Sequence, residues 1–306
     1  MNYVFFDLEC DTVYSKRHGR FINEIIEVGA VCLSQDLEIT GRFDMLVYPE
    51  IFKKLTSRIT EMTGITTSDI EEQGKPFAVV MSAFERWIRG AGDCIVMSWS
   101  TSDLYMLLNN FDYFTDLKTI PFIDRYADFQ KYIQDKLGGS GSRQISLADA
   151  AQTMGLDESG LRHHRAVDDS EICARMLITD FDTERLEKYV QDASVPAFYE
   201  RLFFKPYIIN DIRSPLIDRS QMKFDCPDCE VPAKQRSRFR YRNKAFGAEF
   251  ECPECRGRFT GRVRFKKYYD RVGVMKFVVV PDREKEEAEG GNASEVLQPT
   301  AEGETN

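Results

Sequence analysis

The sequence has no long apolar run: none of its segments approaches the roughly 18–20 residues that a membrane-spanning helix requires. We also expect no signal peptide, because the opening residues MNYVFFDLE are too short and too acidic to act as one. No internal repeat is present. We therefore expect a cytoplasmic globular protein with no membrane partner.

The eight cysteines do not form a disulfide framework. Four are scattered along the chain, three of them in or beside apolar segments, and we expect these four to be small buried hydrophobic side chains. The others form two Cys-Pro-x-Cys pairs separated by 22 residues, Cys226 with Cys229 and Cys252 with Cys255. In a cytoplasmic chain this pattern indicates metal binding, and the paired knuckles predict a zinc ribbon that holds one structural Zn²⁺. A redox role is the alternative, which the matched pairing disfavours.

Charge is segregated along the chain, although the net value is −9. Between Arg219 and Arg271 there are 15 Lys/Arg and 7 Asp/Glu, whereas residues 282–306 hold 2 basic and 8 acidic residues. The last segment is also poor in apolar residues, which predicts a disordered acidic tail. The pattern indicates an acidic body, a basic module over 218–281 and an acidic tail.

Apolar periodicity in the first part of the chain predicts strands at 3–8, 24–33, 41–47, 93–99 and 118–123. Helical spacing and cap residues predict helices at 77–88, 102–110, 146–154 and 166–177. We therefore expect an α/β fold with a mixed sheet covered by helices over 1–182. The glycine-rich segment 138–142 predicts a flexible break, and residues 183–217 predict a helical connector to the small β-rich module.

Carboxylates follow the predicted strands. Asp7 and Glu9 lie two residues apart in an apolar strand, so both project from one face, and their burial favours neutralisation by a hard divalent cation. Asp103 begins a helix after another strand, and His164 and Asp169 lie in HRAVDD. Taken singly, these residues also fit a solvent-facing strand end, a helix N-terminal acid and a surface histidine.

Together these residues resemble the DEDDh exonuclease superfamily, which includes RNase T and the proofreading subunit of bacterial replicative polymerase. The resemblance rests on FFDLE at 5–9, EIIEVGAV at 24–31, LTSRITEMTGIT at 55–66, Asp103, and H-x-A-x-x-D at 164–169. The resemblance implies an RNase H-like fold and a 3′→5′ exonuclease that releases 5′-nucleoside monophosphates. It assigns two Mg²⁺ or Mn²⁺ ions to Asp7, Glu9, Asp103 and Asp169, and the general base to His164. Relatives with this fold are often dimers, so a homodimer is left open.

Two departures from the family pattern bear on the substrate. Ser98-Trp99 stands where many relatives carry His-Asn, and it is similar to the Eri-like and KapD-like subgroup, which tilts the expected substrate toward RNA. Cys10 stands where many relatives carry Thr. The expected partner is a nucleic acid with a free 3′ end, either RNA or single-stranded DNA.

Basic side chains alternate with apolar ones in the cysteine-containing module. These residues are Arg236, Arg238, Arg240, Arg242, Arg262, Arg264 and Lys266. At a strand period of two, one face would be basic and the other apolar, which predicts a phosphate-binding surface that grips the substrate strand. A solvated face and the docking of an acidic protein partner are the alternatives.

Two rival functions use the same residues. A non-catalytic nucleic-acid-binding adaptor could retain the exonuclease fold, although the complete set of acids and His164 disfavours this. An enzyme of the same chemistry could instead act on free nucleotides or very short oligomers, with the zinc ribbon contacting a protein.

Overall fold

The structure is a computed structural model that describes residues 1–52, 54–138, 144–280 and the backbone of 295–297. It divides into two compact units, Met1–Phe203 and Phe204–Asn306, each of which is described by itself. Most of the predicted flexible break at 138–142 and most of the predicted acidic tail at 282–306 lie outside the described residues.

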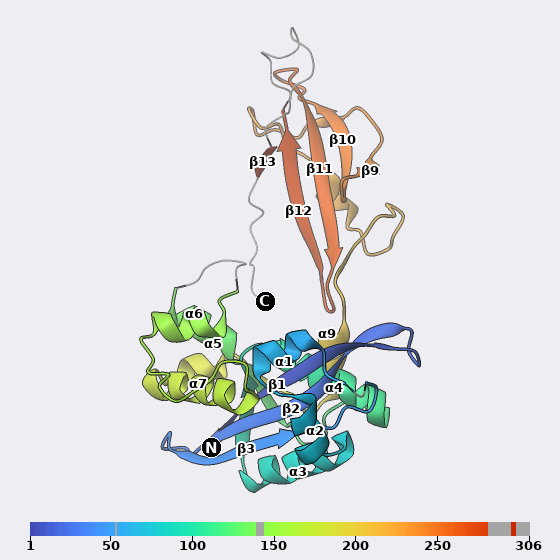
Figure 1. Ribbon diagram of the computed structural model, residues 1–306. Coiled ribbons are helices and arrows are strands. Elements are labelled where there is room, and N and C mark those ends of the chain that lie inside the picture. The colour runs from blue at the N-terminus through green and yellow to red at the C-terminus, as the bar shows by residue number, and fades with distance from the viewer. Residues whose placement is uncertain (53, 139–143, 281–294, 298–306) are drawn as a thin grey trace. The chain divides into compact units, whose positions relative to one another are not determined.

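The first unit contains a six-stranded mixed sheet in the order β3-β2-β1-β4-β5-β6 (Figure 1). Its strands are β1 (Asn2–Ser15), β2 (Arg20–Leu33), β3 (Ile39–Leu46), β4 (Cys94–Ser98), β5 (Arg125–Asp128) and β6 (Val190–Asp192). The strands β1, β4 and β5 run parallel, whereas β2, β3 and β6 are antiparallel to their neighbours. This arrangement confirms the mixed sheet.

Helices cover both faces of this sheet. They are α1 (Ser57–Thr63), α2 (Thr67–Gln73), α3 (Phe77–Gly90), α4 (Thr101–Thr115), α5 (Phe129–Lys136), α6 (Leu147–Thr153), α7 (Ala166–Thr179), α8 (Thr183–Glu187) and α9 (Pro196–Phe203). Three of the helices predicted from the sequence, at 77–88, 146–154 and 166–177, match α3, α6 and α7 within two residues at each end. No helix in the described residues is long and apolar enough to span a bilayer.

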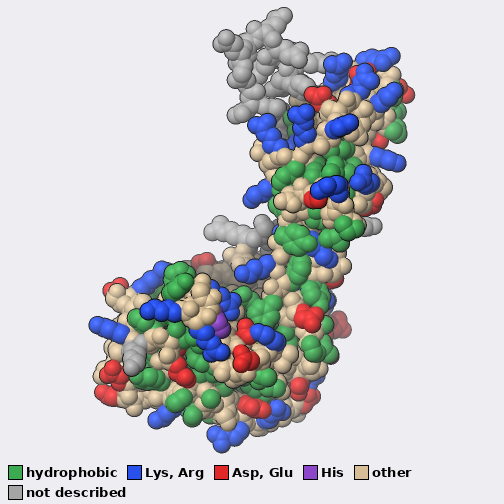
Figure 2. Space-filling model, turned by 90° about the vertical axis from the view of Figure 1, so that its right-hand side faces the viewer, with side chains coloured by type: hydrophobic (Ala, Val, Ile, Leu, Met, Phe, Trp, Pro, Cys, Tyr) green, Lys and Arg blue, Asp and Glu red, His purple; other side chains and the backbone are tan. Residues whose placement is uncertain are grey.

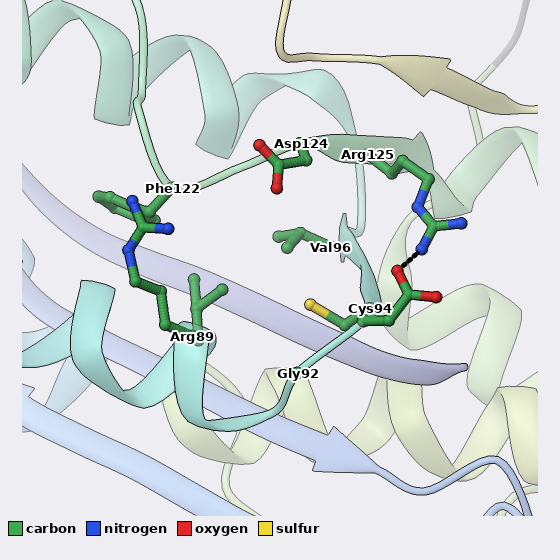
Figure 3. Close-up of a pocket in the computed structure, with 9 residues that line it drawn as sticks. Arg89, Gly92, Cys94, Val96, Phe122, Asp124 and Arg125 are labelled. Carbon is green, nitrogen blue, oxygen red and sulfur yellow. Dashed lines mark hydrogen bonds and ion pairs between the residues drawn. The ribbon is translucent and has the colours of Figure 1, made fainter.

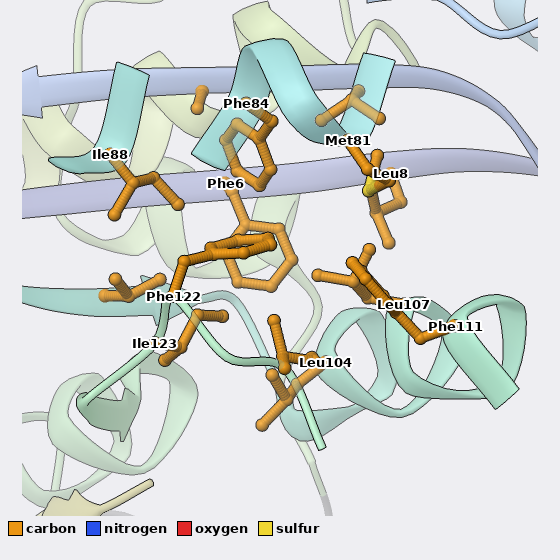
Figure 4. Close-up of a cluster of buried hydrophobic side chains, with 14 of the residues drawn as sticks. Phe6, Leu8, Met81, Phe84, Ile88, Leu104, Leu107, Phe111, Phe122 and Ile123 are labelled. Carbon is orange, nitrogen blue, oxygen red and sulfur yellow. The ribbon is translucent and has the colours of Figure 1, made fainter. Parts of the chain in front are cut away.

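Alternate residues of β1 enter two different hydrophobic cores. Val4, Phe6 and Leu8 pack in a cluster with α3, α4 and α9, part of which Figure 4 shows around Phe6 and Phe84. Tyr3 and Phe5 pack on the opposite face with α5, α6 and α7. Because side chains alternate along a strand, Asp7 and Glu9 continue the series that faces α7.

Helix α7 lies unusually close to β2, and a glycine makes this approach possible. A Cβ atom on Gly29 would lie 2.0 Å from the backbone nitrogen of Val167. The Ser170 hydroxyl donates to the carbonyl of Gly29 at 3.1 Å. Gly29 is also the register partner of Asp7 on β1. The start of α7 is therefore held beside the strand that carries Asp7 and Glu9.

The strand predicted at 118–123 is wrong. These residues form a loop, and the strand next to β4 is β5, which begins at Arg125. Ile120, Phe122 and Ile123 are nevertheless buried in the core. The apolar pattern therefore indicated burial and not strand pairing. Pro121 prevents a central strand here because it lacks the N–H group that pairs with a neighbouring strand.

The second unit is a small β-structure with the strand order β13-β12-β11-β10-β8, in which β7 pairs with β11 and β9 pairs with β10. Its elements are β7 (Tyr207–Ile208), a 3₁₀ turn (Arg219–Met222), β8 (Lys234–Gln235), β9 (Arg240–Arg242), β10 (Ala245–Glu251), β11 (Arg258–Lys267), β12 (Val272–Val279) and β13 (Glu295–Leu297). Aromatic side chains dominate its core, among them Phe224, Phe246, Phe250, Phe259 and Phe265. The strand β13 falls within the predicted acidic tail and pairs with β12.

The stretch 183–217, expected as a separate helical connector, is divided between the two units instead. Helices α8 and α9 belong to the first unit, and β6 adds a strand to its sheet. The strand β7 pairs with β11 of the second unit. The sequence pattern missed this because a two- or three-residue strand carries no periodicity and forms only where a partner strand offers hydrogen bonds.

Replacement of Gly29 tests the close approach of α7. We expect Gly29→Ala to lower the free energy of unfolding by about 3 kcal/mol, because the added methyl group overlaps the backbone of α7. Chemical denaturation measures the change. Gly90→Ala is the matched control, since a Cβ there meets nothing within 4 Å, and it should be neutral. Equal stabilities of the two variants would contradict the packing.

Candidate active site and cysteine cluster

Four carboxylates converge where β1 passes α4 and α7. Asp7 and Glu9 come from β1, and Glu9 is 6% exposed. A bulge in the pairing of β1 with β2 follows directly, between Glu9 and Cys10. Asp103 comes from the first turn of α4 and is also buried, with a hydrogen bond from the backbone of Leu8. That bond places Asp103 against the same segment of β1.

The start of α7 supplies Asp169 and the loop before it supplies His164. Asp169 is buried in the first turn, and one of its oxygens accepts a hydrogen bond from the backbone N–H of His164 at 3.0 Å. His164 is exposed and has a positive φ of 64°, a left-handed conformation that turns the loop into the helix. Ligand atoms of Glu9, His164 and Asp169 all lie within 4.8 Å of one another.

Mutual repulsion and burial raise the pKa values of these acids. The pKa of Asp7 lies well above its usual range, mainly because of burial and then because Asp103, Asp169 and Glu9 are close. Burial, followed by repulsion from Asp169, raises the pKa of Glu9 to about 8. Burial likewise raises the pKa of Asp103 to about 7. The cluster therefore favours either protons or a cation.

The residues fit a divalent cation. The Asp169 Oδ1 atom is buried and accepts no well-aligned hydrogen bond among the described residues, although the His163 Nδ1 atom lies 3.4 Å from it. A buried carboxylate oxygen without a partner is costly, and several acidic oxygens at one place match the ligands that Mg²⁺ and Mn²⁺ prefer. The acids predicted from the sequence as metal ligands are thus brought together at one site.

Sequence reasoning missed the group that fixes α7. Arg165, the residue before α7, makes no side-chain cap of its own. Instead the Glu27 carboxylate of β2, which is fully buried, accepts a hydrogen bond from the Ala166 N–H at 2.9 Å and another from Arg165 Nε at 2.8 Å. Only the burial of a charged residue inside an apolar strand, EIIEVGAV, could have signalled this role.

Two neighbours of the site have distinct surroundings. Asp168 accepts a hydrogen bond from the Arg162 N–H at 3.1 Å and so holds the loop before α7. His163 lies between acids, with Nε2 at 2.6 Å from Glu158 Oε2 and Nδ1 at 3.4 Å from Asp169 Oδ1. The adjacent residues Asp168 and Asp169 therefore differ in what they contact, although the sequence makes them look alike.

A cavity in the first unit lies elsewhere. It has a volume of about 240 Å³ and is lined by Arg89, Cys94, Phe122, Asp124 and Arg125 among others (Figure 3). Cys94 pairs with Asn2 at the beginning of β1. Asp7 is five residues further along that strand, or about 17 Å at the usual rise, so this cavity is separate from the carboxylates.

The four cysteines of the second unit form one cluster. Their sulfur atoms lie within 4.8 Å of one another, and Cys226 and Cys255 are 3.7 Å apart. Tetrahedral zinc with Zn–S distances of about 2.3 Å separates its sulfurs by about 3.8 Å, so the cluster fits such an ion. Each knuckle has the same turn: Glu230 N–H donates to Cys226 and Arg256 N–H to Cys252, and both donors have φ near +60°.

The basic residues of this unit fall into two groups. Glu251 is within 3.1–3.4 Å of Arg236, Arg256 and Arg258, so these side chains are engaged inside the unit. The side chains of Arg238, Arg240 and Arg242 are exposed and make no hydrogen bond or ion pair within the described part of the chain. Figure 2 shows basic side chains on this unit with few acidic ones among them.

The expected basic strand over 236–242 is only partly formed. Residues 236–239 are a loop between β8 and β9, and only Arg240 and Arg242 lie in a strand. The alternation predicted for 262–266 is present in β11, where Val263 and Phe265 are fully buried. There Arg264 donates to the Lys244 carbonyl at 3.1 Å, and Lys266 lies over the Tyr268 ring.

The mixed sheet and its clustered acids define the DEDDh class of nuclease fold. The RNase_T family model, described as an exonuclease, matches residues 4–177, more than half of the chain. The chain belongs to this exonuclease family.

Several curated proteins are similar to this chain. Mouse ERI1 exoribonuclease 2 is 30% identical over 175 residues, which cover 48% of this chain and 24% of the relative. Human 3′-5′ exoribonuclease 1 is 29% identical, covering 52% and 46%. DNA polymerase III PolC-type of Clostridium perfringens is 28% identical, covering 62% and 12%. The chain therefore spans less than half the length of these relatives.

A solved structure supports the fold. The nuclease domain of 3′hExo, described as a DEDDh family member bound to rAMP, superimposes with a TM-score of 0.50 and 23% identity. The match covers 59% of this chain and 92% of that one. The two chains share the arrangement of sheet and helices.

The raised pKa values predict a link between pH, cations and stability. The folded state binds the protons of Glu9 and Asp103 more tightly than the unfolded chain does, so without Mg²⁺ or Mn²⁺ its stability is lost as pH rises from about 4.5 toward about 8. We expect the melting temperature to fall over this range and added Mg²⁺ to raise it more at about pH 8 than at about pH 5. Calorimetry measures both changes.

The control for this experiment is Asp7→Asn, which removes one of the repelling charges and should flatten both dependences. A melting temperature that responds to neither pH nor Mg²⁺ would contradict the interpretation of the cluster.

Proposed function

We propose that this chain is a metal-dependent 3′→5′ exonuclease acting on nucleic acid with a free 3′ end. The observation that carries the proposal is the convergence of Asp7, Glu9, Asp103 and Asp169 beside His164, in a domain of the exonuclease family. The hydrolysis releases 5′-nucleoside monophosphates from the 3′ end.

The four carboxylates Asp7, Glu9, Asp103 and Asp169 would hold two Mg²⁺ or Mn²⁺ ions. When bound, these ions would supply activation of water and stabilisation of the leaving 3′-oxygen of the phosphodiester. His164 takes the proton from the attacking water, which its exposed position at the rim of the acids allows. Asp169 holds the loop through the His164 backbone N–H and so positions the histidine.

The substrate we assign is RNA or single-stranded DNA, with RNA preferred. Two of the similar proteins are named as exoribonucleases, and Ser98-Trp99 is of the type found in the Eri-like subgroup. The similarity to a PolC-type polymerase supports keeping DNA within the proposal. Cytoplasmic location and a homodimer stay predictions.

The second unit is proposed to hold one structural Zn²⁺ through Cys226, Cys229, Cys252 and Cys255, and to grip the substrate strand. A closed four-thiolate site stabilises a small fold rather than catalysing a reaction. Support for the grip comes from the exposed arginines Arg238, Arg240 and Arg242, beside the 41% exposed ring of Tyr241. Arginine binds phosphate, and tyrosine stacks on bases.

Two adjacent aspartates test the catalytic assignment. We expect Asp169→Asn to lower exonuclease turnover by more than about 100-fold, because it removes a charge from the site and a ligand that lies beside His164. Asp168→Asn should change turnover only a few-fold, since that carboxylate contacts the Arg162 backbone. Shortening of a 5′-labelled oligonucleotide measures both rates.

A wild-type chain that binds the oligonucleotide without shortening it would favour the non-catalytic adaptor. Equal losses in the two aspartate variants would instead place the chemistry elsewhere in the domain.

Two sets of arginines test whether the second unit binds the substrate strand. We expect the triple change of Arg238, Arg240 and Arg242 to Gln to reduce the slope of log affinity against log salt by about 2, because each phosphate contact on a single strand contributes about 0.7. Anisotropy of a labelled oligonucleotide measures the slope. The matched triple change of Arg236, Arg256 and Arg258 should alter it less, since Glu251 already engages them. Equal slopes would argue that the surface contacts a protein instead.

A further inference from the structure

The β1–β2 ribbon continues beyond the carboxylates and carries an exposed aromatic pair. In Figure 1 this ribbon (dark blue) extends past the helices at one end of the first unit. Tyr14 and Phe21 are directly paired across its two strands, with ring centroids 5.3 Å apart. They are 54% and 71% exposed, and Phe21 is the most exposed large hydrophobic residue in the described part of the chain.

The opposite face of the ribbon is buried, which makes the ribbon a fixed platform. Val13, Ser15 and Ile22 are each at most 6% exposed. The Asn110 side chain of α4 donates to the Asn23 carbonyl at 2.8 Å and accepts from the Ile25 N–H at 3.2 Å. The aromatic pair is thus held by packing and hydrogen bonds behind it.

The tip of the ribbon is also attached to α4. The His18 ring packs edge-on against Tyr113, with centroids 4.7 Å apart, and the Arg17 guanidinium lies over the same ring. Arg20 lies 3.9 Å from Asp112, a separation that gives only a weak, solvent-screened pair. These contacts order the turn while leaving its charges exposed to solvent.

The charge of the ribbon is opposite to that of the unit that carries it. Residues 12–23, TVYSKRHGRFIN, contain Lys16, Arg17 and Arg20 and no acidic residue. The rest of the first unit is rich in Asp and Glu. Positive charge with exposed rings is the combination by which proteins hold single-stranded nucleic acid, since phosphates meet cations and bases stack on aromatic faces.

We infer that the Tyr14–Phe21 ribbon is a second contact for the substrate, binding the single strand upstream of its 3′ end. The inference rests on the proposed function and deepens it by naming where the body of the strand lies. Tyr14 follows Glu9 by five residues on β1, about 17 Å at the usual strand rise. One strand thus connects the cleaved end to bases a few nucleotides away.

A protein partner or a second copy of the chain would be expected to need a broader apolar face. Stable protein interfaces bury on the order of 800 Å² on each side, whereas this patch consists of two rings beside a basic turn. The exposed neighbours Thr12 and Asn23 are polar and hydrogen-bonded to each other. Both properties favour a nucleic acid as the occupant.

The test compares Tyr14→Ala/Phe21→Ala with two controls in the full chain. Val79→Ala/Ile178→Ala removes exposed apolar side chains from helices of the same unit, and Tyr14→Phe/Phe21→Tyr keeps both rings. The substrates are a dinucleotide and a single strand of about 12 nucleotides, which is within the usual range for one binding surface. Steady-state kinetics give KM and kcat for each.

We expect the double alanine variant to raise KM for the longer strand by about 10- to 100-fold, with kcat and dinucleotide cleavage unchanged. Both control variants should behave as the wild type does. An equal change for the two substrates, or no change for either, would overturn the inference.

Binding measured without cleavage separates this inference from the proposed function. Placing Tyr14→Ala/Phe21→Ala in an Asp7→Asn background should weaken anisotropy binding of the longer strand by a similar factor, whether or not the chain is a nuclease. If binding is unchanged while light scattering shows that the double alanine variant alters the oligomeric state, the ribbon joins copies of the chain and the inference fails.

Discussion

The close packing of α7 on β2 is the constraint on which the site depends. Gly29 leaves no Cβ between strand and helix, and the buried Glu27 carboxylate binds the helix N-terminus and Arg165 together. A negative group at a helix N-terminus is favourable because it meets unpaired N–H groups and the positive end of the helix dipole. Asp169 is thereby held within reach of the acids on β1, at a cost in repulsion that the fold sustains.

The same packing explains why the carboxylates of the site repel one another without being neutralised by a basic side chain. Carboxylates inside an apolar sheet would normally be eliminated or paired with a base, yet Arg165 is engaged with Glu27 rather than with Asp7. The Arg165 guanidinium thus pairs with Glu27, which supports the start of α7, and the site acids around Asp7 have no such partner among the described residues to compete with a cation. A cation bound there would relieve the repulsion among these carboxylates, so stability and metal affinity would be coupled at this point.

Acidic and basic side chains are also distributed unevenly within each of the two units. The first unit is acidic overall and carries a site proposed to act on a polyanion, whereas its β1–β2 turn holds three basic residues and no acidic one, and the second unit has basic side chains of its own. In the second unit Glu251 engages three arginines, so only some of the charge counted along the sequence is available to a partner. Counting the basic residues along the sequence therefore overstates how many arginines of the second unit are free to bind a partner.

The sequence by itself determined the mixed sheet, the helices α3, α4, α6 and α7, and the candidate acids, because alternation along β1 and motif spacing are local properties that burial makes visible. It misplaced the strand expected at 118–123 and misread 183–217 as a connector, because apolar residues report burial and short strands depend on partners. Glu27, the division of the arginines and the Tyr14–Phe21 pair were decided by the tertiary structure alone. Each depends on contacts between residues distant in the chain, and such contacts leave no periodic trace in the sequence.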